Sequence, residues 1–589
     1  MTTSNPQIKS ILAVDCGTTT TTVTLIELIE DHYQLVAVGQ ARSTHGSPWH
    51  DMSVGFQRAA QQIEQENRKT LLAQGSGWPI VPRNANQQGV DAFIVVTSAG
   101  VPLPVTLVGL TKEISLTSAR RAAATTYTLI NNEFALDRPL ANGQRSPEAR
   151  MQVIRDSRPE TILLMGGADG GADQPVVELA HLISMALRVS LGSAPPDILF
   201  AGNAEIRDLV TEILHPVARL KVIDNVRPTL DTENLAIIQQ ELEQLYVERK
   251  MSQLPGLNKL KNWSRLPIIP TSRSFERVIT YLGEQNNLNV VGLDIGSRTS
   301  MLSSQARGQH NITIRPDAGV GHSLATLLKL VPIEKIHRWL PFELNLESLQ
   351  NKLLNKSLHP SGLPNNEEDL LIDYAIAREA MRLVVGQAQS SWPSQMAGGR
   401  RAIQWDLLIG AGLTLTKAPH FGYSTLLLLD GFEPWGVTKL SLDLAGLTSV
   451  LGSVAAIEPV AAVEVIAHES SFLNLGTIIA PLGHGVAGKA ALNLKLIDEE
   501  EVVTEFSATY GTIQLIPLAP GKKATLEIRP TRTFDIGLGQ PGRGAVAEVE
   551  GGLLGLIVDA RGRPLRLPDH DEIRQAQLQQ WLTSVGVKR

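Results

Sequence analysis

Two segments of the chain share one pattern, and they lie almost half its length apart. Residues 11–22 read ILAVDCGTTTTT and residues 290–300 read VVGLDIGSRTS. In each, an apolar stretch typical of a buried strand ends at an aspartate, and a glycine and a turn rich in Thr or Ser follow. Glycine permits a tight turn, hydroxyls and turn amides can surround an oxyanion, and an aspartate can reach a hydrated cation. The pair predicts a duplicated fold in which two loops clamp a nucleotide.

One strand–Asp–Gly–turn segment alone would be weak support for phosphate binding, because the same pattern occurs at polar corners of hairpins. The interpretation depends on repetition, since later features recur as well. Residues 165–171, MGGADGG, follow a predicted buried strand, and residues 408–416, LIGAGLTLT, do so in the second half. Glycines after a strand let a charged ligand approach the backbone, although an ordinary glycine-rich turn is an equally good explanation of either segment alone.

The composition is that of a folded protein with more than one domain. The chain has 589 residues, of which 43% are hydrophobic and 19% charged. Its net charge of -6 gives no reason to expect nucleic acid or an anionic membrane as a partner. Cys16 is the single cysteine, so no internal disulfide can form, and we expect it to be a small buried residue. The N-terminal residues show no signal-peptide pattern, and acidic residues and a proline interrupt the most apolar stretch, residues 442–467. These features predict a cytoplasmic protein.

Strand–helix alternation predicts an α/β fold. The first loop is followed by an antiparallel meander, and residues 52–72 are typical of a helix. Strands of a mostly parallel sheet are expected at residues 93–96, 161–165, 197–201 and 220–223, with connections at 142–147 and 264–273. In the second half we expect strands at 311–314, 407–410 and 425–429 and a helix at 368–388.

The tail has a different character. Residues 490–560 contain short alternating runs separated by glycine turns, which predicts an all-β domain, and a helix is expected at 570–583. Asp559, Arg561 and Arg563 fall at a turn and are expected to be solvated, with a partner-binding surface as the alternative. The predicted domains are residues 1–285, 286–480 and 481–589.

Several common catalytic signatures are absent. The sequence contains no GxxxxGK[ST], HExxH or GxSxG motif and no Cys/His cluster. His322 and His484 lie in glycine-rich turns, where a structural role is the simpler expectation. No nucleophile or general base can be assigned, so any ATP hydrolysis is expected to depend on Mg²⁺ and a positioned water molecule.

Taken in order, these segments resemble those of a known family. The paired D-x-G-[ST] loops and the later strand–Gly–x–Gly motif resemble the superfamily of acetate and sugar kinases, Hsp70 and actin. The order of segments resembles more closely the glutamate mutase MutL family, also called GlmL. The segments that carry the resemblance are DCGTTTT, TSAGVPLPVTLVGLT, LLMGGADGG, FAGN, DNVRP, PTSRSFERVI, DIGSRTS, LLIGAGLTLT and EVEGGLLGLIVDARGRP (residues 548–564). The resemblance implies two ribonuclease H-like halves of the actin and Hsp70 type, followed by the β-rich tail.

The resemblance also implies a function. The family is associated with adenosylcobalamin-dependent carbon-skeleton mutases, for which its members look like ATP-dependent reactivating chaperones. The first phosphate loop would be formed by Asp15, Gly17, Thr18 and Thr19, and the second by Asp294, Gly296, Ser297 and Thr299. Gly410 and Gly412 would border the adenosine of ATP or ADP, and Asp15 and Asp294 would hold Mg²⁺ through water. The sequence has no DxHxxG motif, so the cobalamin would belong to the partner mutase.

The second loop departs from the family pattern, which we expect to read DxGGATTD. Ser297 stands in place of the second glycine, and Met301 follows Ser300 where the pattern leads to an aspartate. These changes leave open whether the protein hydrolyses ATP: it could be a weak ATPase or have no ATPase activity. Two alternatives also stay open: a small-molecule kinase, for which Asp169 or Asp317 could supply the base, and a non-enzymatic scaffold whose loops hold no nucleotide.

Overall fold

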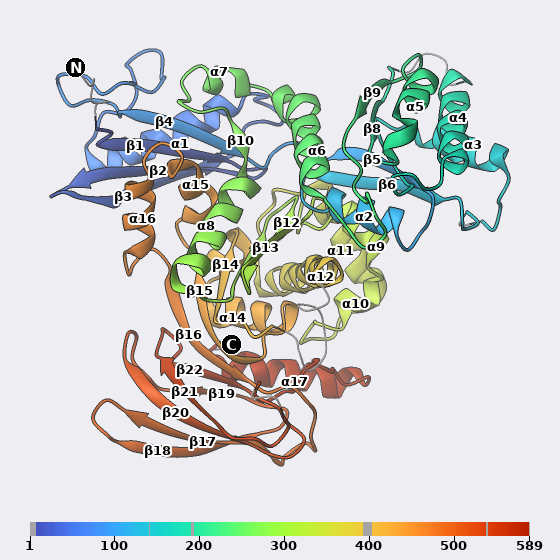
Figure 1. Ribbon diagram of the computed structural model, residues 1–589. Helices are drawn as coiled ribbons and strands as arrows, with labels where there is room; N and C mark the ends of the chain where they lie inside the picture. The colour runs from blue at the N-terminus through green and yellow to red at the C-terminus, as the bar shows by residue number, and fades with distance from the viewer. Residues whose placement is uncertain (1–6, 141, 190–193, 393–402, 538–539, 588–589) are drawn as a thin grey trace. The chain divides into compact units, whose positions relative to one another are not determined.

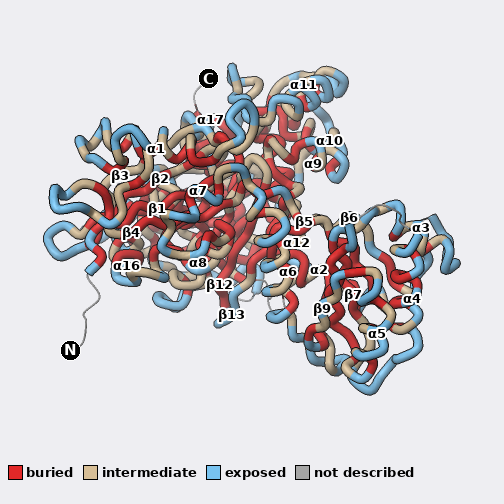
Figure 2. Tube along the Cα trace, turned by 90° about the horizontal axis from the view of Figure 1, so that it is seen from above, coloured by how far each residue is buried: buried red, intermediate tan, exposed pale blue. Residues whose placement is uncertain are grey.

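The computed structural model of this chain describes residues 7–140, 142–189, 194–392, 403–537 and 540–587. Two compact units are found: Met1–Ala99 with Pro255–Thr313 and Asp317–Arg589, and Gly100–Leu254 with Ile314–Pro316 (Figure 1). Figure 2 shows that the buried residues follow the strands in each unit. A search of the described helices finds none with the length and apolar character needed to span a membrane.

The first sheet of the larger unit contains the first predicted loop. Its strand order is β10-β4-β1-β2-β3, in which β1–β2 and β2–β3 are antiparallel and β1–β4 and β4–β10 are parallel. The predicted meander is therefore confirmed. Helix α1 begins after Asp51, whose side chain accepts a hydrogen bond from the Ser53 amide, and packs on β1, β2 and β3. The elements are β1 Ser10–Cys16, β2 Thr20–Ile29, β3 His32–Arg42, α1 Met52–Asn67, β4 Ala92–Thr97, α7 Leu257–Lys261 and β10 Ile269–Pro270.

A second sheet repeats this plan. Its strands run β13-β12-β11-β14-β15, with β11–β12 antiparallel and β11–β14 and β14–β15 parallel, and β16, β22 and β19 then extend it. The register repeats too, since Asp15 pairs with Thr22 and Val96, and Asp294 pairs with Met301 and Ala411 at the corresponding positions. The elements are β11 Val290–Ile295, β12 Ser300–Ala306, β13 Gln309–Arg315, β14 Leu407–Ala411, β15 Gly436–Leu442 and β16 Leu473–Ala480. The duplicated α/β fold predicted from the sequence is confirmed.

Two helices join the halves by crossing over. Helix α8 (Thr271–Asn286) follows the first sheet but packs on β11 and β12, whereas α15 (Leu447–Val454) follows the second sheet and packs on β1 and β4. The two helices also pack against each other, and a Cβ at Gly452 would lie 2.2 Å from the Ser274 carbonyl oxygen. This close approach holds the carboxyl ends of β1 and β11 in one region of the unit. The other helices here are α9 Leu324–Leu330, α10 Ile333–His337, α11 Leu346–Leu358, α12 Glu367–Ser391, α13 Leu413–Thr416 and α16 Pro459–Ala467.

Some predicted elements are confirmed and others are wrong. The helix expected at 368–388 is α12, which begins with three acidic residues after the capping residue Asn366. The strand expected at 425–429 is instead part of helix α14 (Phe421–Gly431), in which ten consecutive residues are buried. Because α14 is buried on all sides, its sequence has no helical periodicity to distinguish it from a buried strand. The connection expected at 264–273 contains β10 and the start of α8.

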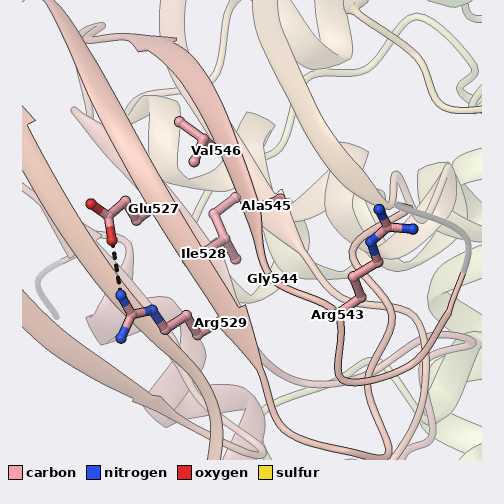
Figure 3. Close-up of a pocket in the computed structure, with 7 residues that line it drawn as sticks. All are labelled: Glu527, Ile528, Arg529, Arg543, Gly544, Ala545 and Val546. Atoms are coloured by element: carbon pink, nitrogen blue, oxygen red, sulfur yellow. Dashed lines mark hydrogen bonds and ion pairs between the residues drawn. The ribbon is translucent and has the colours of Figure 1, made fainter.

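The tail is only partly separate from the second half. Strands β17 (Ala490–Asp498), β18 (Val503–Thr509), β20 (Lys523–Pro530) and β21 (Ala545–Glu550) form a sheet of their own in the order β18-β17-β20-β21. By contrast, β19 (Ile513–Ile516) and β22 (Leu556–Asp559) join the larger sheet beside β16, and α17 (Asp571–Ser584) packs on β19. A cavity of ≈ 420 Å³ lies on the four-stranded sheet, lined by residues 527–529 and 543–546, with Glu527 and Arg529 paired at 3.1 Å (Figure 3).

The charged turn of the tail is not solvated, so the expectation for Asp559, Arg561 and Arg563 is wrong. All three are buried, because they pair with one another and with Asp430 of α14. These ion pairs offset the free energy that is lost when charged groups are removed from water. The same pairing excludes them as a partner-binding surface.

The smaller unit is a parallel sheet with helices around it. Its strand order is β6-β5-β7-β8-β9 and each neighbouring pair is parallel. The strands expected at 161–165, 197–201 and 220–223 belong to it, whereas the one expected at 93–96 is β4 of the first sheet. The elements are β5 Leu103–Gly109, α2 Ser115–Ala123, β6 Thr128–Ala135, α3 Pro147–Ser157, β7 Thr161–Met165, α4 Gln174–Val189, β8 Asp197–Phe200, α5 Arg207–Leu214, β9 Arg219–Val222 and α6 Ala236–Arg249. The domain boundaries expected at 285 and 480 both fall inside the larger unit and remain a prediction.

Candidate functional site

The two predicted loops have the same turn geometry. The Gly17 amide donates to the Thr20 carbonyl oxygen at 3.0 Å, and the Gly296 amide donates to the Thr299 carbonyl oxygen at 2.9 Å. A Cβ at Gly17 or Gly296 would lie 2.8 Å or 2.9 Å, respectively, from that same oxygen. Any larger residue would push the turn open, so the hairpin geometry accounts for both glycines.

Asp15 and Asp294 lie near the carboxyl ends of β1 and β11 and interact electrostatically. Burial raises the pKa of Asp15 to about 6, although hydrogen bonds from Thr271 and Ser449 oppose the shift. Burial raises the pKa of Asp294 to about 7, and the nearby charges of Asp15 and Asp443 add to the shift. The described residues provide no hydrogen bond to the Asp294 carboxyl group. An ionised Asp294 carboxylate without a hydrogen bond costs the free protein stability, and a bound cation would relieve that cost.

Two further residues of this region, Thr271 and Asp443, were not predicted. Thr271, the first residue of α8, donates from its hydroxyl to Asp15 Oδ1 at 2.8 Å. Asp443 follows β15 and accepts hydrogen bonds from the amides of Leu447 and Thr448, each at 2.8 Å, so it caps α15. Burial raises the pKa of Asp443, while these hydrogen bonds lower it. A strand ending in Asp, LSLD, was visible in the sequence, but its glycine, Gly446, comes three residues after the Asp, so the segment lacks the D-x-G-[ST] spacing.

The two glycines predicted near the adenosine differ in their surroundings. A Cβ at Gly412, where φ is +88°, would lie 2.4 Å from the Ile295 carbonyl oxygen and 2.6 Å from Asp294 Oδ1. Gly412 therefore lies directly beside the carboxylate. A Cβ at Gly410 would instead meet core side chains of Leu442, Leu428 and Leu415 at 2.9–3.2 Å. Gly410 is explained by close packing of the core, and its contact with adenosine remains a prediction.

The hydroxyl groups of the loops divide into paired and unpaired ones. The buried Oγ1 atoms of Thr19 and Thr299 have no hydrogen-bond partner. Ser297 Oγ lies 2.8 Å from His322 Nδ1 and accepts the His322 amide at 3.2 Å. His322 is thus paired with Ser297, and Nε2 of His484 lies 2.8 Å from the Pro564 carbonyl oxygen.

These observations fit a nucleotide with its Mg²⁺. The unpaired threonine hydroxyls suit phosphate oxygens, Gly412 leaves room beside Asp294, and the two carboxylates suit a hydrated cation. Within the described ranges no group of three or more His, Cys, Asp or Glu side chains is placed to hold a metal ion directly.

The glycine-rich segment 165–171 of the smaller unit is held by its own polar network. Asp169 accepts hydrogen bonds from the Ala204 amide at 2.8 Å and from Asn225 Nδ2 at 2.9 Å. The buried Asn203 accepts from the Gly170 amide at 3.2 Å and donates to Asp173 at 2.5 Å. The Asp169 carboxylate is thereby used to order the loop. Both hydrogen bonds go to Oδ1 of this exposed side chain, and a role for Asp169 as a general base remains a prediction.

Comparison with known proteins decides the family. The model of the family described as MutL protein matches residues 11–470, which is most of the chain. The chain belongs to the MutL family. A curated relative, Protein MutL of Clostridium tetanomorphum, is 23% identical over 486 residues, which cover 76% of this chain and 96% of that protein. The resemblance inferred from the sequence is confirmed, although residues 548–564, which contributed to it, lie beyond the matched range.

Solved structures show weaker similarity. Nucleotide-free acetone carboxylase is 11% identical, with a TM-score of 0.30, over 85% of this chain and 81% of that chain. Component A of (R)-2-hydroxyglutaryl-CoA dehydratase from Acidaminococcus fermentans is 10% identical, with a TM-score of 0.25, over 75% of this chain and 95% of that chain. The ethanolamine utilization protein EutJ from Carboxydothermus hydrogenoformans is 9% identical, with a TM-score of 0.26, over 76% of this chain and 89% of that chain. The assignment of this MutL-family chain to the actin- and Hsp70-like fold is consistent with its duplicated topology.

Proposed function

We propose that this MutL-family protein binds ATP or ADP with Mg²⁺ in its larger unit and acts as a reactivation or assembly factor for an adenosylcobalamin-dependent mutase such as glutamate mutase. The observation that carries the nucleotide part is the repetition of one loop at one register, with Asp15 and Asp294 at equivalent positions. Family membership supports the choice of partner.

The residues around the two loops suggest a division of roles. Asp15 and Asp294 would hold Mg²⁺ through water, and Thr271 and Ser449 would keep Asp15 in place. Gly17, Thr18 and Thr19 would surround phosphate oxygens on one side, and Gly296, Ser297 and Thr299 on the other. Gly412 would leave space for the nucleotide beside Asp294. Bound Mg²⁺ would neutralise phosphate charge, and the protein groups would orient the nucleotide and exclude water from its phosphates.

The partner's reactivation would follow from a change between two states. Nucleotide that contacts both loops would favour a closed arrangement of the two halves of the larger unit, and its release or hydrolysis would favour an open one. A partner that prefers one arrangement would then bind and dissociate with the nucleotide state. Such a factor would need no cobalamin site of its own.

The first test is thermal unfolding with and without ATP–Mg²⁺ and ADP–Mg²⁺. A ligand that binds only the folded state must raise the melting temperature. We expect both nucleotides to do so, and Asp294→Ala to abolish the shift while His310→Gln, an exposed change on β13, leaves it intact. Absence of any shift at millimolar nucleotide would contradict nucleotide binding and favour a scaffold.

The second test addresses the partner. Glutamate mutase inactivated by cyanocobalamin is incubated with the protein, free adenosylcobalamin and ATP–Mg²⁺, and recovery of mutase activity is measured. We expect recovery that requires both the protein and ATP. ATP consumption that appears only with a small-molecule acceptor would instead identify a kinase.

A further inference from the structure

Two histidines lie together beside the second loop. His45 follows β3, and His322 lies in the turn between β13 and α9. Their rings are 6.4 Å apart between centroids with an angle of 48° between the planes, and both side chains are half-buried. Arg298, in the second loop, acts electrostatically on both imidazoles. The cluster thus joins three cationic or potentially cationic groups of the larger unit.

Each imidazole is tied to one of the two loops. Ser297 Oγ lies 2.8 Å from His322 Nδ1, so His322 is tied to the second loop. His45 Nδ1 lies 3.0 Å from Ser43 Oγ, and the Ser43 amide donates to the Thr19 carbonyl oxygen of the first loop at 2.8 Å. Two segments far apart in sequence therefore bring imidazoles to the same place, each through a serine.

The contacts of Ser297 suit a neutral His322 that accepts at Nδ1. Ser297 Oγ accepts the His322 amide at 3.2 Å and lies 2.8 Å from Nδ1, to which its hydroxyl can donate. A neutral His322 that accepts at Nδ1 carries its proton on Nε2. His322 then presents an N–H donor to an acceptor such as a phosphate oxygen without first having to be protonated.

The charges around the pair favour an anion. Burial, Arg298 and His50 lower the pKa of His45, and burial, Arg298 and His45 lower the pKa of His322 to about 4. Every charged group that shifts either imidazole is thus a cation or another histidine. A bound anion would reverse this balance, because a neighbouring negative charge stabilises the protonated imidazole.

We propose that His45, His322 and Arg298 form a subsite for the terminal phosphate of a nucleoside triphosphate, adjoining the two candidate phosphate loops. The subsite rests on the proposed nucleotide binding and adds to it a means of distinguishing ATP from ADP. It also gives Ser297 a function. Where the family pattern has glycine, the serine hydroxyl fixes the orientation of His322.

The affinity test uses isothermal titration calorimetry of the full chain with ATP–Mg²⁺ and ADP–Mg²⁺. His322→Asn places an amide where Nδ1 lies but has no group at Nε2, whereas His322→Gln can extend an amide toward the Nε2 position. We expect His322→Asn to weaken ATP binding about tenfold and ADP binding less than about twofold, as for loss of one hydrogen bond to a charged group. His322→Gln should recover part of the loss, and His310→Gln should bind both nucleotides as the wild type does.

The proton test uses the same titrations at pH 6 in two buffers of different ionisation enthalpy, which reports the protons taken up. ATP binding should take up more protons than ADP binding, and a His45→Gln, His322→Gln double variant should lose that difference. Equal effects of His322→Asn on ATP and ADP, or equal proton uptake for the two nucleotides in the wild type, would overturn the subsite. Failure of the wild type to bind either nucleotide would instead overturn the proposed function, and the subsite with it. Each variant's melting temperature without nucleotide establishes that it is folded.

Discussion

At the scale of single residues, the partly buried carboxylates of Asp15 and Asp294 should cost the protein stability. The folded-state pKa of Asp15, about 6, and that of Asp294, about 7, lie above the ordinary value of 3.8. Between pH 4 and pH 7 the folded state therefore holds more protons than the unfolded one, and stability should fall as the pH rises through this range. In EDTA at pH 8 we expect Asp294→Asn to raise the free energy of unfolding by about 2 kcal/mol, with a gain that shrinks toward pH 4.

Differential scanning calorimetry at several pH values checks this prediction. Asp443→Ala supplies a control of opposite sign, because it removes the cap of α15 and should cost about 1 kcal/mol or more. If Asp294→Asn destabilised the protein at pH 8 as Asp443→Ala does, the electrostatic account of Asp294 would be wrong.

Gly412 should be irreplaceable for a steric reason. A Cβ there would lie 2.4 Å from the Ile295 carbonyl oxygen and 2.6 Å from Asp294 Oδ1, at a φ of +88°. We expect Gly412→Ala to remove the melting-temperature shift produced by ATP–Mg²⁺ and to cost about 1–3 kcal/mol of stability. Gly308→Ala is the matched control, since its φ of +74° is similar but no atom lies within 4 Å of the added Cβ. If ATP–Mg²⁺ raised the melting temperature of Gly412→Ala as much as that of the wild type, Gly412 would not be part of the nucleotide site.

At the scale of elements, the sequence predicted what local pattern determines. Strands β1 and β11 were predictable because each apolar run ends at an Asp-x-Gly turn, and α12 because an acidic first turn precedes a long helical segment. Helix α14 was not, because a helix buried on every side has no amphipathic signal. Thr271 was missed for another reason: it meets Asp15, 256 residues away in the sequence, because β10 joins the first sheet beside β4, and no local pattern encodes that pairing.

The buried charges of the tail connect β22 to α14 and α12, which predicts a large stability effect. Asp559 accepts from Arg561 at 2.9 Å and from Arg563 at 2.5 Å, and Asp430 accepts from Arg561 and Arg378, each at 2.7 Å. Burial alone would raise the pKa of Asp559, but the two arginines hold it well below its usual range. Asp559→Ala would leave buried arginine charge uncompensated and should cost about 3–5 kcal/mol.

Urea unfolding measures this cost. Glu527→Ala removes ion pairs to Lys495 and Arg529 on the exposed face of the four-stranded sheet and should change little. Equal effects of the two substitutions would show that the buried network contributes no more than a surface pair.

At the scale of the whole molecule, duplication explains why one region collects the functional groups. Each half supplies a loop and an aspartate, and each sends the following helix, α8 or α15, onto the sheet of the other half. Ser449 of α15 thereby supports Asp15 across the pseudo-repeat, while Thr271 supports Asp15 from its own half. The family match ends at residue 470, but the larger unit does not end there.

The segment beyond the family match should be required for folding. Ile513, Ile557, Leu578 and Trp581 belong to the same hydrophobic core as Val291 and Leu293 of β11, and β22 and β19 extend the sheet past β16. A chain ending at residue 470 would expose this core and leave β15 as a bare edge, so we expect it to aggregate or to unfold without a cooperative transition. Removal of α17 alone, from Asp571, takes away fewer core side chains and should lower the melting temperature while keeping a transition. Circular dichroism melts of the full chain and the two truncations distinguish these outcomes. A cooperative transition of the 1–470 chain at the full-length melting temperature would show that the matched region is a self-sufficient core, with the tail an independent addition.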